Sequence, residues 1–347
     1  MTAKHLLFLS FFCFFVSART MGQNLVLPQV SQRAEVIQRL GYTDIDIVYS
    51  SPNVNGRKIW NDLVPYGEVW RAGANDNTTI SFTDDVTING QSLAAGTYGL
   101  HMIPTASEWT IIFSKNHTSW GSFFYRKEED ALRVTTKPEA CEMHESLDYT
   151  FMDRAASSCK VALSWERLRV PFTVAVDAKN ITLRHIREQL RNQPGFGWHG
   201  WEEAAHYCIE NKFNYEEGLR WANNSIRMEE NYTNLAAKAQ LQKLMGNSKE
   251  ADETKKKVLE LVGQASEAGA NLFAYELMNE DDMPTALEVF KMNVKKHPDS
   301  WNAYDSMGEA YGRAGDKKLA LTNYKTALAK APAEQQERIK RIIAGMQ

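Results

Sequence analysis

At 347 residues, the chain is long enough for two ordinary domains with separate cores, and its net charge of −3 comes from interspersed acidic and basic residues. Because no basic tract or stripe stands out, the composition predicts no nucleic-acid partner. Nine tryptophans and an aromatic share of 11% exceed what the obvious core periods use, which leaves aromatic rings for surfaces or pockets.

The first element along the chain is a targeting segment. Lys4 precedes an apolar run at residues 6–16 that is too short to span a bilayer, and small residues follow it. This pattern predicts a cleavable signal peptide over residues 1–22, cut after Ala18 or after Gly22, with an uncleaved anchor as the alternative. No other segment approaches transmembrane length. We therefore expect no membrane span after cleavage and a location in the periplasm, in the cell envelope or outside the cell.

From about residue 43 to residue 177, apolar and polar side chains alternate in short runs separated by Gly, Pro, Asn and Asp. A period of two is typical of half-buried strands, and Asn89-Gly90 predicts a tight hairpin. Pro171 predicts that the last strand lies at a sheet edge, because proline cannot donate to a strand ladder. The pattern predicts an antiparallel β-sandwich or barrel over residues 25–177. The expected strands are Ile45–Tyr49, Asp85–Gly90, Gly96–Ile103, Trp109–Phe113, Leu147–Phe151, Val161–Trp165 and Val170–Val176.

Two loops in this region carry side chains suited to ligand binding. Arg57 and Arg71 can each hold a carboxylate or sulfate in bidentate fashion, with Trp60 or Trp70 stacking on a sugar ring. The structural alternative is that the same turns brace the sheets, with Trp70 filling one end of the sandwich. The candidate ligand-binding residues are Arg57, Trp60, Arg71, Asn75, His101 and Trp120.

The sequence lacks the common catalytic motifs: it has no Gly-x-Ser-x-Gly, phosphate-binding P-loop or His-Glu-x-x-His. No catalytic residue can be assigned from it, and no cofactor is predicted. His101 and His144 form a metal-binding pair only if adjacent strands aim them the same way, which their spacing does not require, so no metal site is predicted. A Cys141–Cys159 disulfide is possible in an oxidising compartment. However, a tight hairpin between their strands would not place these cysteines opposite each other.

From about residue 181 the apolar period becomes helical, and the sequence repeats itself. Ala286, Phe290 and Pro298 recur as Ala320, Tyr324 and Pro332, each 34 residues later. This spacing is typical of tetratricopeptide repeats, and residues 201–208 and 246–251 resemble two degenerate earlier units. We predict a tetratricopeptide-like solenoid over residues 181–347, which binds a protein partner or only packs against or dimerises the β domain.

The glycine-rich run at residues 195–200 precedes these repeats. It has aromatic rings where a phosphate group would need space. We therefore interpret it as a hinge or a corner between helices and not as a nucleotide-binding loop.

Several ordered blocks in the β region carry a family resemblance. The blocks are Tyr49–Trp60, Leu63–Gly67, Val69–Asn75, Val86–Gly90, Ala95–Pro104, Trp109–Phe113, Ser119–Tyr125 and Asp130–Val134. Over roughly residues 25–177 they resemble the exported "domain of unknown function 2911" family, whose similar members carry the same tetratricopeptide tail. The resemblance implies an envelope protein of Bacteroidota-type bacteria. No activity is agreed for that family, so the resemblance implies no reaction.

Two classes of function follow from these observations. The first is a non-catalytic envelope protein whose β domain binds a carbohydrate or another anionic or polar small ligand, and whose repeats bind a protein. The alternative is a hydrolase or related enzyme, metal-assisted or not, with Arg71, Asn75 and His101 in a pocket of the β domain. The sequence does not decide whether the protein is an enzyme.

The sequence predicts export, and this prediction is directly testable. The mature protein should begin at Arg19 or Gln23, because the small residues lie just before these positions. Mass spectrometry of the N-terminal peptide, on protein isolated from the cell envelope, checks the cleavage position. A Leu9→Arg variant breaks the apolar run and should remain in the cytosol. Intact Met1 on the wild-type protein in the cytosol would contradict export.

Overall fold

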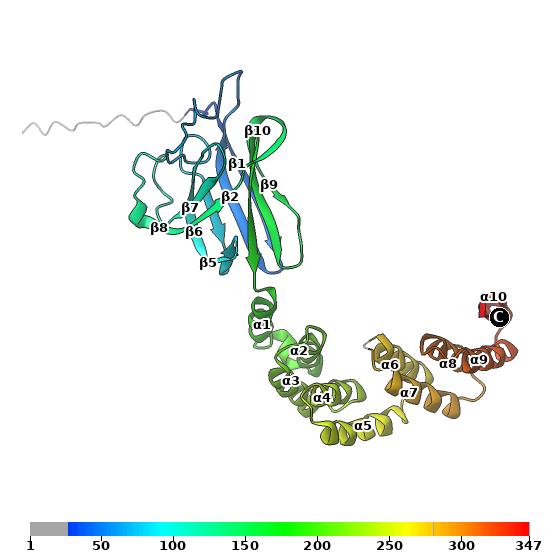
Figure 1. Cartoon of the computed structure of the whole chain (residues 1–347). Helices are drawn as coiled ribbons and strands as arrows, with labels where there is room; N and C mark the ends of the chain where they lie inside the picture. The colour runs from blue at the N-terminus through cyan, green and yellow to red at the C-terminus, as the bar shows by residue number, and fades with distance from the viewer. Residues whose placement is uncertain (1–26, 280, 347) are drawn as a thin grey trace, which may run out of the picture. The chain divides into compact units, whose positions relative to one another are not determined.

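The computed structural model describes residues 27–279 and 281–346 (Figure 1). The predicted signal peptide and both cleavage positions lie outside the described residues. The chain divides between Ala178 and Lys179 into two compact units, each with its own buried residues. We call the described residues up to 178 the β unit and those from 179 the helical unit.

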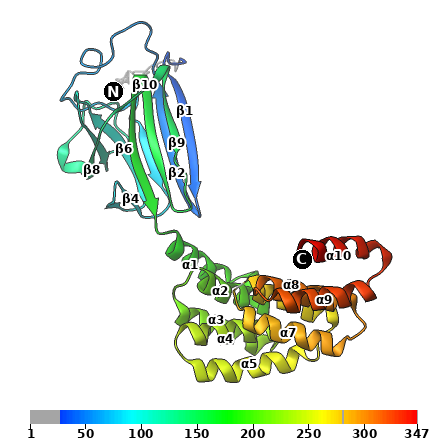
Figure 2. The same ribbon diagram turned by 45° about the vertical axis from the view of Figure 1, so that its right-hand side comes forward.

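The β unit consists of two antiparallel sheets (Figure 2). The six-stranded sheet has the order β1 (Gln32–Leu40), β2 (Thr43–Ser51), β3 (Thr79–Phe82), β6 (Gly96–Ile103), β7 (Trp109–Ser114) and β8 (Asp130–Thr136). The four-stranded sheet has the order β5 (Gln91–Leu93), β4 (Val86–Ile88), β10 (Ser158–Val176) and β9 (Glu139–Met152). In the described residues no strand pairing joins the two sheets into a closed barrel. Of the two predicted architectures, the sandwich is confirmed.

The alternation of side chains along each strand sends one face of each sheet into the core. On β2 the side chain of Ile47 is fully buried, and on β6 those of Leu100 and Met102 are fully buried. Each such side chain contributes about 1.5–3 kcal/mol of transfer free energy to folding. His101 lies between Leu100 and Met102 in sequence, so its side chain lies on the opposite face of the sheet. That face is also covered at this point, because His101 is only 2% exposed.

The hairpin predicted at Asn89-Gly90 is confirmed. Ile88 of β4 pairs with Gln91 of β5, so Asn89 and Gly90 form a two-residue turn between them. Their φ angles are 46° and 82°, and two positive φ values are what the turn that suits tightly paired strands requires.

The prediction that Pro171 lies in an edge strand is wrong. The segments predicted as two strands form one, β10, which lies between β4 and β9. β10 pairs with β9 as far as Arg169 and with β4 from Val174 onward. Pro171 lies between these two ladders, where neither ladder uses a backbone N–H at its position. The pairing with β9 is also irregular around Glu166, whose φ is 56°, as expected for a bulge.

The helical unit is a series of antiparallel helix pairs. Its helices are α1 (Ala178–Gln189), α2 (Trp198–Glu210), α3 (Tyr215–Met228), α4 (Tyr232–Leu244), α5 (Ser248–Val262), α6 (Glu267–Asn279), α7 (Met283–Lys296), α8 (Trp301–Arg313), α9 (Lys317–Lys330) and α10 (Ala333–Met346). The first helices of the pairs, α2, α4, α6 and α8, begin 34 or 35 residues apart. This spacing confirms the predicted tetratricopeptide-like repeats, and the two degenerate units correspond to α2–α3 and α4–α5. None of the described helices is long and apolar enough to cross a bilayer.

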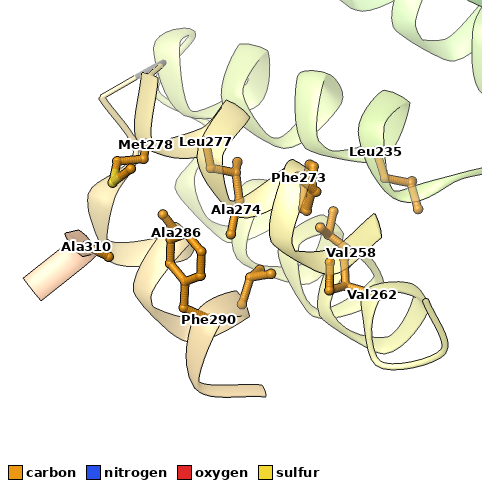
Figure 3. Close-up of a cluster of buried hydrophobic side chains, with 12 residues drawn as sticks. Leu235, Val258, Val262, Phe273, Ala274, Leu277, Met278, Ala286, Phe290 and Ala310 are labelled. Carbon is orange, nitrogen blue, oxygen red and sulfur yellow. The ribbon is translucent and has the colours of Figure 1, made fainter. Parts of the chain in front are cut away.

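Small residues let the two helices of a pair approach each other, and aromatic rings fill the adjacent space. Ala286 and Phe290 of α7 are fully buried and belong to a cluster with Phe273 and Ala274 of α6 (Figure 3). In the last pair a Cβ on Gly308 of α8 would lie only 3.0 Å from the ring of Tyr324 on α9. The residues that repeat in the sequence are therefore the residues at the helix contacts.

A tight corner precedes α2, as interpreted for residues 195–200. A 3₁₀ turn over Gln193–Phe196 leads into α2. A Cβ on Gly195 would lie 1.9 Å from the carbonyl oxygen of Leu190, and one on Gly200 would lie 2.4 Å from that of Pro194. These close approaches require glycine. The corner between helices is therefore confirmed.

We predict that Gly308→Val destabilises the helical unit by about 1–3 kcal/mol, because the added methyl groups overlap the Tyr324 ring. Urea denaturation followed by far-ultraviolet circular dichroism measures this free energy of unfolding. Gly345→Val is the matched control, since Gly345 has no neighbour within 4 Å of the added Cβ. It should change the free energy by less than about 0.5 kcal/mol. Equal losses in the two variants would contradict the assigned helix contact.

Candidate functional site

The segment of residues 67–75 reaches the six-stranded sheet through Trp70. The backbone N–H groups of Trp70 and Met102 each donate to the other residue's carbonyl at 2.8 Å. The Trp70 ring stacks on that of Trp165, with centroids 6.0 Å apart and planes inclined by 16°. Trp60 lies 4.9 Å from Trp109 in the same cluster. Trp70 thus braces the sandwich.

The indole ring of Trp60 packs against the other tryptophan rings of this cluster. Its centroid lies 6.0 Å from that of Trp70 and 5.9 Å from that of Trp165. Trp60 also does not line the cavity beside Arg71 that is described below. The structure therefore does not bring Trp60 and Arg71 together in one pocket.

Arg57 and Asn75 hydrogen-bond to backbone carbonyl groups. Arg57 is exposed, and it donates from Nε to Val54 at 3.0 Å and from Nη2 to Asn53 at 2.5 Å. Asn75, with a φ of 58°, donates from Nδ2 to the carbonyl oxygen of Ser31 at 3.1 Å. Both side chains hold loops in place, and the structure does not bring them into one pocket with Arg71.

His101 is covered by the β7–β8 loop, residues 115–129. Its Nδ1 lies 2.9 Å from Oγ of Ser122, and its ring centroid lies 5.3 Å from that of Tyr125. Burial lowers the pKa of His101 to about 4, and the negative charge of Asp130 only partly opposes this effect. At neutral pH the imidazole is therefore uncharged, and it holds the loop through the Ser122 hydroxyl group.

A polar cluster fixes the end of the same loop. The Tyr125 hydroxyl donates to Oδ2 of Asp130 at 2.8 Å, and Nε of Arg133 donates to the same oxygen at 2.5 Å. Arg133 also donates from Nη2 to the Tyr125 hydroxyl. Burial and the bond to Asp130 raise the pKa of Tyr125 to about 12, so the phenol stays protonated. With Ser122, these contacts hold the β7–β8 loop at both its middle and its end.

Arg71 lies beside this loop at a small cavity of about 210 Å³ lined by Val69, Trp70, Arg71, Ser122 and Phe123. We call it the Arg71 pocket. The guanidinium lies 5.6 Å from the centroid of the Trp120 ring. Its Nε is buried and has no hydrogen-bond partner in the described part of the chain. Burial lowers the pKa of Arg71.

Gly121 is needed for this close approach. Its φ is 64°, and a Cβ at this position would lie 2.4 Å from Nη1 of Arg71. On either side of it, Trp120 and Phe123 stack with centroids 5.8 Å apart and planes inclined by 10°. These two side chains are 55% and 75% exposed, so the pocket combines a cation with an exposed aromatic surface.

Of the predicted ligand-binding residues, the structure thus brings together Arg71 and Trp120, with His101 behind the loop. Ser122 and Phe123 were not among the predicted ligand-binding residues. One signal pointed to them: the run from Ser119 to Tyr125 has four aromatic residues in a segment without strand alternation. Exposed aromatic residues in a loop often mark a contact surface.

The other predicted features of the β unit lie elsewhere. His144 is on β9 of the four-stranded sheet, where its Nδ1 lies 3.1 Å from Oδ1 of Asp148, so it is not on a strand adjacent to that of His101. Cys141 and Cys159 are free thiols. Among the described residues, no group of three or more His, Cys, Asp or Glu side chains is placed to hold a metal ion.

Comparison with protein families agrees with the sequence blocks. Residues 31–174 match the family described as "Protein of unknown function (DUF2911)". The resemblance stated above is thereby confirmed for the β unit. No curated protein matches the chain.

Solved structures resemble the chain through helical repeats. MamA 41-end from Desulfovibrio magneticus RS-1 has 18% identity and a TM-score of 0.26, and the match covers 43% of this chain and 82% of that one. YrrB, described as a TPR protein with an unusual peptide-binding site, has 16% identity and a TM-score of 0.26 over 47% and 83% of the two chains. The C-terminal part of a TPR repeat-containing protein from Cytophaga hutchinsonii has 12% identity and a TM-score of 0.26 over 45% and 59%. At these values the similarities carry no argument about function.

The low pKa of His101 predicts a pH-dependent stability of the β unit. The unfolded chain binds a proton at His101 near pH 6.5 and the folded chain only near pH 4. The unfolded state therefore binds more protons between these values, and stability is lost as the pH falls from about 6.5 toward 4. The loss between pH 7 and pH 5 should be about 2 kcal/mol.

Urea denaturation followed by tryptophan fluorescence at pH 7 and pH 5 measures this loss. His101→Gln keeps a polar side chain without a titrating group, so its loss should be smaller by the same amount. A pH dependence identical in the wild type and the variant would refute the role of His101.

Proposed function

We propose that the chain is an exported, non-catalytic binding protein of the bacterial envelope. In this proposal the helical repeats bind a protein partner and the β unit binds a polar small ligand. The observation that carries the first part is a groove of about 370 Å³ in the helical unit, lined by residues of α2, α4 and α6. These are the first helices of three successive repeats, the helices that line the concave surface of such solenoids.

The composition of this groove favours a partner segment with basic and apolar side chains. Glu203 and Glu210 of α2 are exposed there, and the lining also includes Glu202 of α2 and Glu276 of α6. Phe273 and Leu277, both buried, supply an apolar floor. Opposite charges at the rim of such a groove accelerate association and set the register of a bound segment.

The polar-ligand part of the proposal rests on the Arg71 pocket. A guanidinium that has no carboxylate partner among the described residues lies there beside exposed aromatic rings. Pockets for small molecules typically combine a few polar groups with apolar walls. The pocket is the place in the β unit where predicted ligand-binding residues come together.

One observation favours a hydrolase as the second candidate. The Ser122 hydroxyl lies 2.9 Å from Nδ1 of His101 and lines the same cavity as Arg71, which is the arrangement of a nucleophile next to a base. However, a general base works best with a pKa near the operating pH. The pKa of His101, about 4, makes it a weak base, and the non-catalytic function is therefore preferred.

Photo-crosslinking in the bacterium that carries the gene tests the protein-binding part. Benzoylphenylalanine in place of Glu203 or Thr233, which both line the groove, should give an adduct of defined mass on the full-length protein. The same residue in place of Lys256, an exposed position on the second helix α5, should give none. Equal adducts at all three positions, or none in the groove, would contradict the proposal.

The charges of the groove provide an independent check. With the crosslinker at Thr233, the double variant Glu203→Lys, Glu210→Lys should lower the adduct yield about tenfold, which corresponds to 1.4 kcal/mol. Lys256→Glu, Lys257→Glu on α5 changes the net charge in the opposite direction outside the groove. It should leave the yield within about twofold of the wild type.

A further inference from the structure

We propose that the Arg71 pocket binds the carboxylate of an acidic sugar, with the sugar ring stacked on the aromatic pair Trp120–Phe123. The inference rests on the proposed function, because it names the ligand class of the β unit. The charge of the pocket, its aromatic surface, its rigidity and its size all support this ligand class.

The charge of the pocket favours an anionic ligand. Among the described residues, Arg71 forms no hydrogen bond or ion pair that would compensate for its partial burial, and its buried Nε has no hydrogen-bond partner there. Its pKa is lowered by burial, and no nearby carboxylate counteracts this effect. A partly buried cation without a counter-charge is costly. A ligand carboxylate would supply the missing charge through short charge-assisted hydrogen bonds.

The aromatic surface selects a ring-shaped ligand. Trp120 and Phe123 are stacked in parallel and largely exposed, although exposed rings of this size are costly to leave in water. The Trp120 ring also faces the guanidinium at 5.6 Å. A sugar with a carboxylate has one apolar ring face for the aromatic pair and one anionic group for Arg71. A simple inorganic anion would leave the aromatic pair without a contact.

The pocket is formed before any ligand binds, because hydrogen bonds to the sheet hold the β7–β8 loop in place. Ser122 is bonded to His101, and Tyr125 is bonded to Asp130 and Arg133. Gly121 brings the loop backbone against Arg71. Binding therefore orders few side chains, which favours affinity for a small ligand.

The volume limits the ligand to about one ring. The cavity of about 210 Å³ is smaller than the roughly 300–1,000 Å³ that drug-sized ligands occupy. A single acidic sugar unit, free or at the end of a glycan, matches this size. A long chain would have to extend beyond the pocket over the exposed ring of Phe123.

Isothermal titration of the full mature chain with single sugars tests the proposal. The probes are D-glucuronate and D-galacturonate, with D-glucose, glucose 6-sulfate and acetate as comparisons. We expect at least one of the two uronates to bind at least tenfold more tightly than glucose and acetate. If glucose 6-sulfate binds more tightly than both uronates, the proposal that Arg71 recognises a carboxylate is wrong. If acetate binds as tightly as the uronates, the proposed contact between the sugar ring and the aromatic pair is wrong.

Three variants place the binding in the pocket. Arg71→Met and Trp120→Ala should each weaken uronate binding at least tenfold, whereas Arg57→Met should retain it, since Arg57 is an exposed arginine outside the pocket. If Arg71→Met fails to fold, Phe123→Ala takes its place, because this side chain is 75% exposed. Equal losses with Arg57→Met, or no loss with Trp120→Ala, would overturn the proposal.

The outcome is separable from that of the proposed function. If no uronate binds but the groove in the helical unit gives its crosslinked adduct, the sugar assignment fails and the protein-binding function stands. If a uronate binds but no adduct forms, sugar binding by the β unit is supported and protein binding by the helical repeats is contradicted.

Discussion

The backbone bridge between Trp70 and Met102 decides which side chains of residues 67–75 enter the core and which face the β7–β8 loop. The two hydrogen bonds of this bridge, both 2.8 Å long, fix the Trp70 ring against Trp165. Because successive side chains of an extended segment point to opposite sides, Arg71 is then directed out of the core and toward Gly121. A shift of one residue would place the guanidinium among the tryptophans, where a charge has no partner. The direction of the Arg71 side chain is therefore set by a backbone contact and not by the side chains around it.

The Arg71 pocket and the groove in the helical unit depend on different kinds of contact. The Arg71 pocket needs contacts between residues far apart in sequence, since β6, residues 67–75 and the β7–β8 loop must all be in place. The groove in the helical unit needs only that one local unit be repeated, because first helices spaced 34 or 35 residues apart come to lie on one face. A substitution such as one at Gly121 would alter the pocket by itself, whereas a substitution in one repeat leaves the others able to form their contacts.

The sequence was sufficient wherever a local rule dictates structure. The 34-residue recurrence of Ala286 and Phe290 predicted the helix pairs, and Asn89-Gly90 predicted the hairpin. Prediction from the sequence failed where the local structure depends on contacts with residues far away in the chain. Pro171 was placed at an edge because the rule considers one strand at a time, whereas β10 changes partners around it. In the site, Arg71 and Arg57 carry the same donors, and only the folded structure distinguishes the arginine that bonds its own turn from the one that does not.

The tryptophan cluster has a consequence for spectroscopy. Trp60, Trp70, Trp109 and Trp165 form five ring pairs with centroids 4.9–6.4 Å apart. Their electronic transitions are close enough to couple, and excitation energy can pass among them before emission. In the helical unit, no pair of tryptophan rings is in contact among the described residues; Trp198 contacts His199 instead. The near-ultraviolet circular dichroism of the intact chain should thus be dominated by coupled indoles of the β unit. Its emission should be strongly depolarised for the same reason. The coupled tryptophan signal therefore reports on the folding of the β unit without any added label.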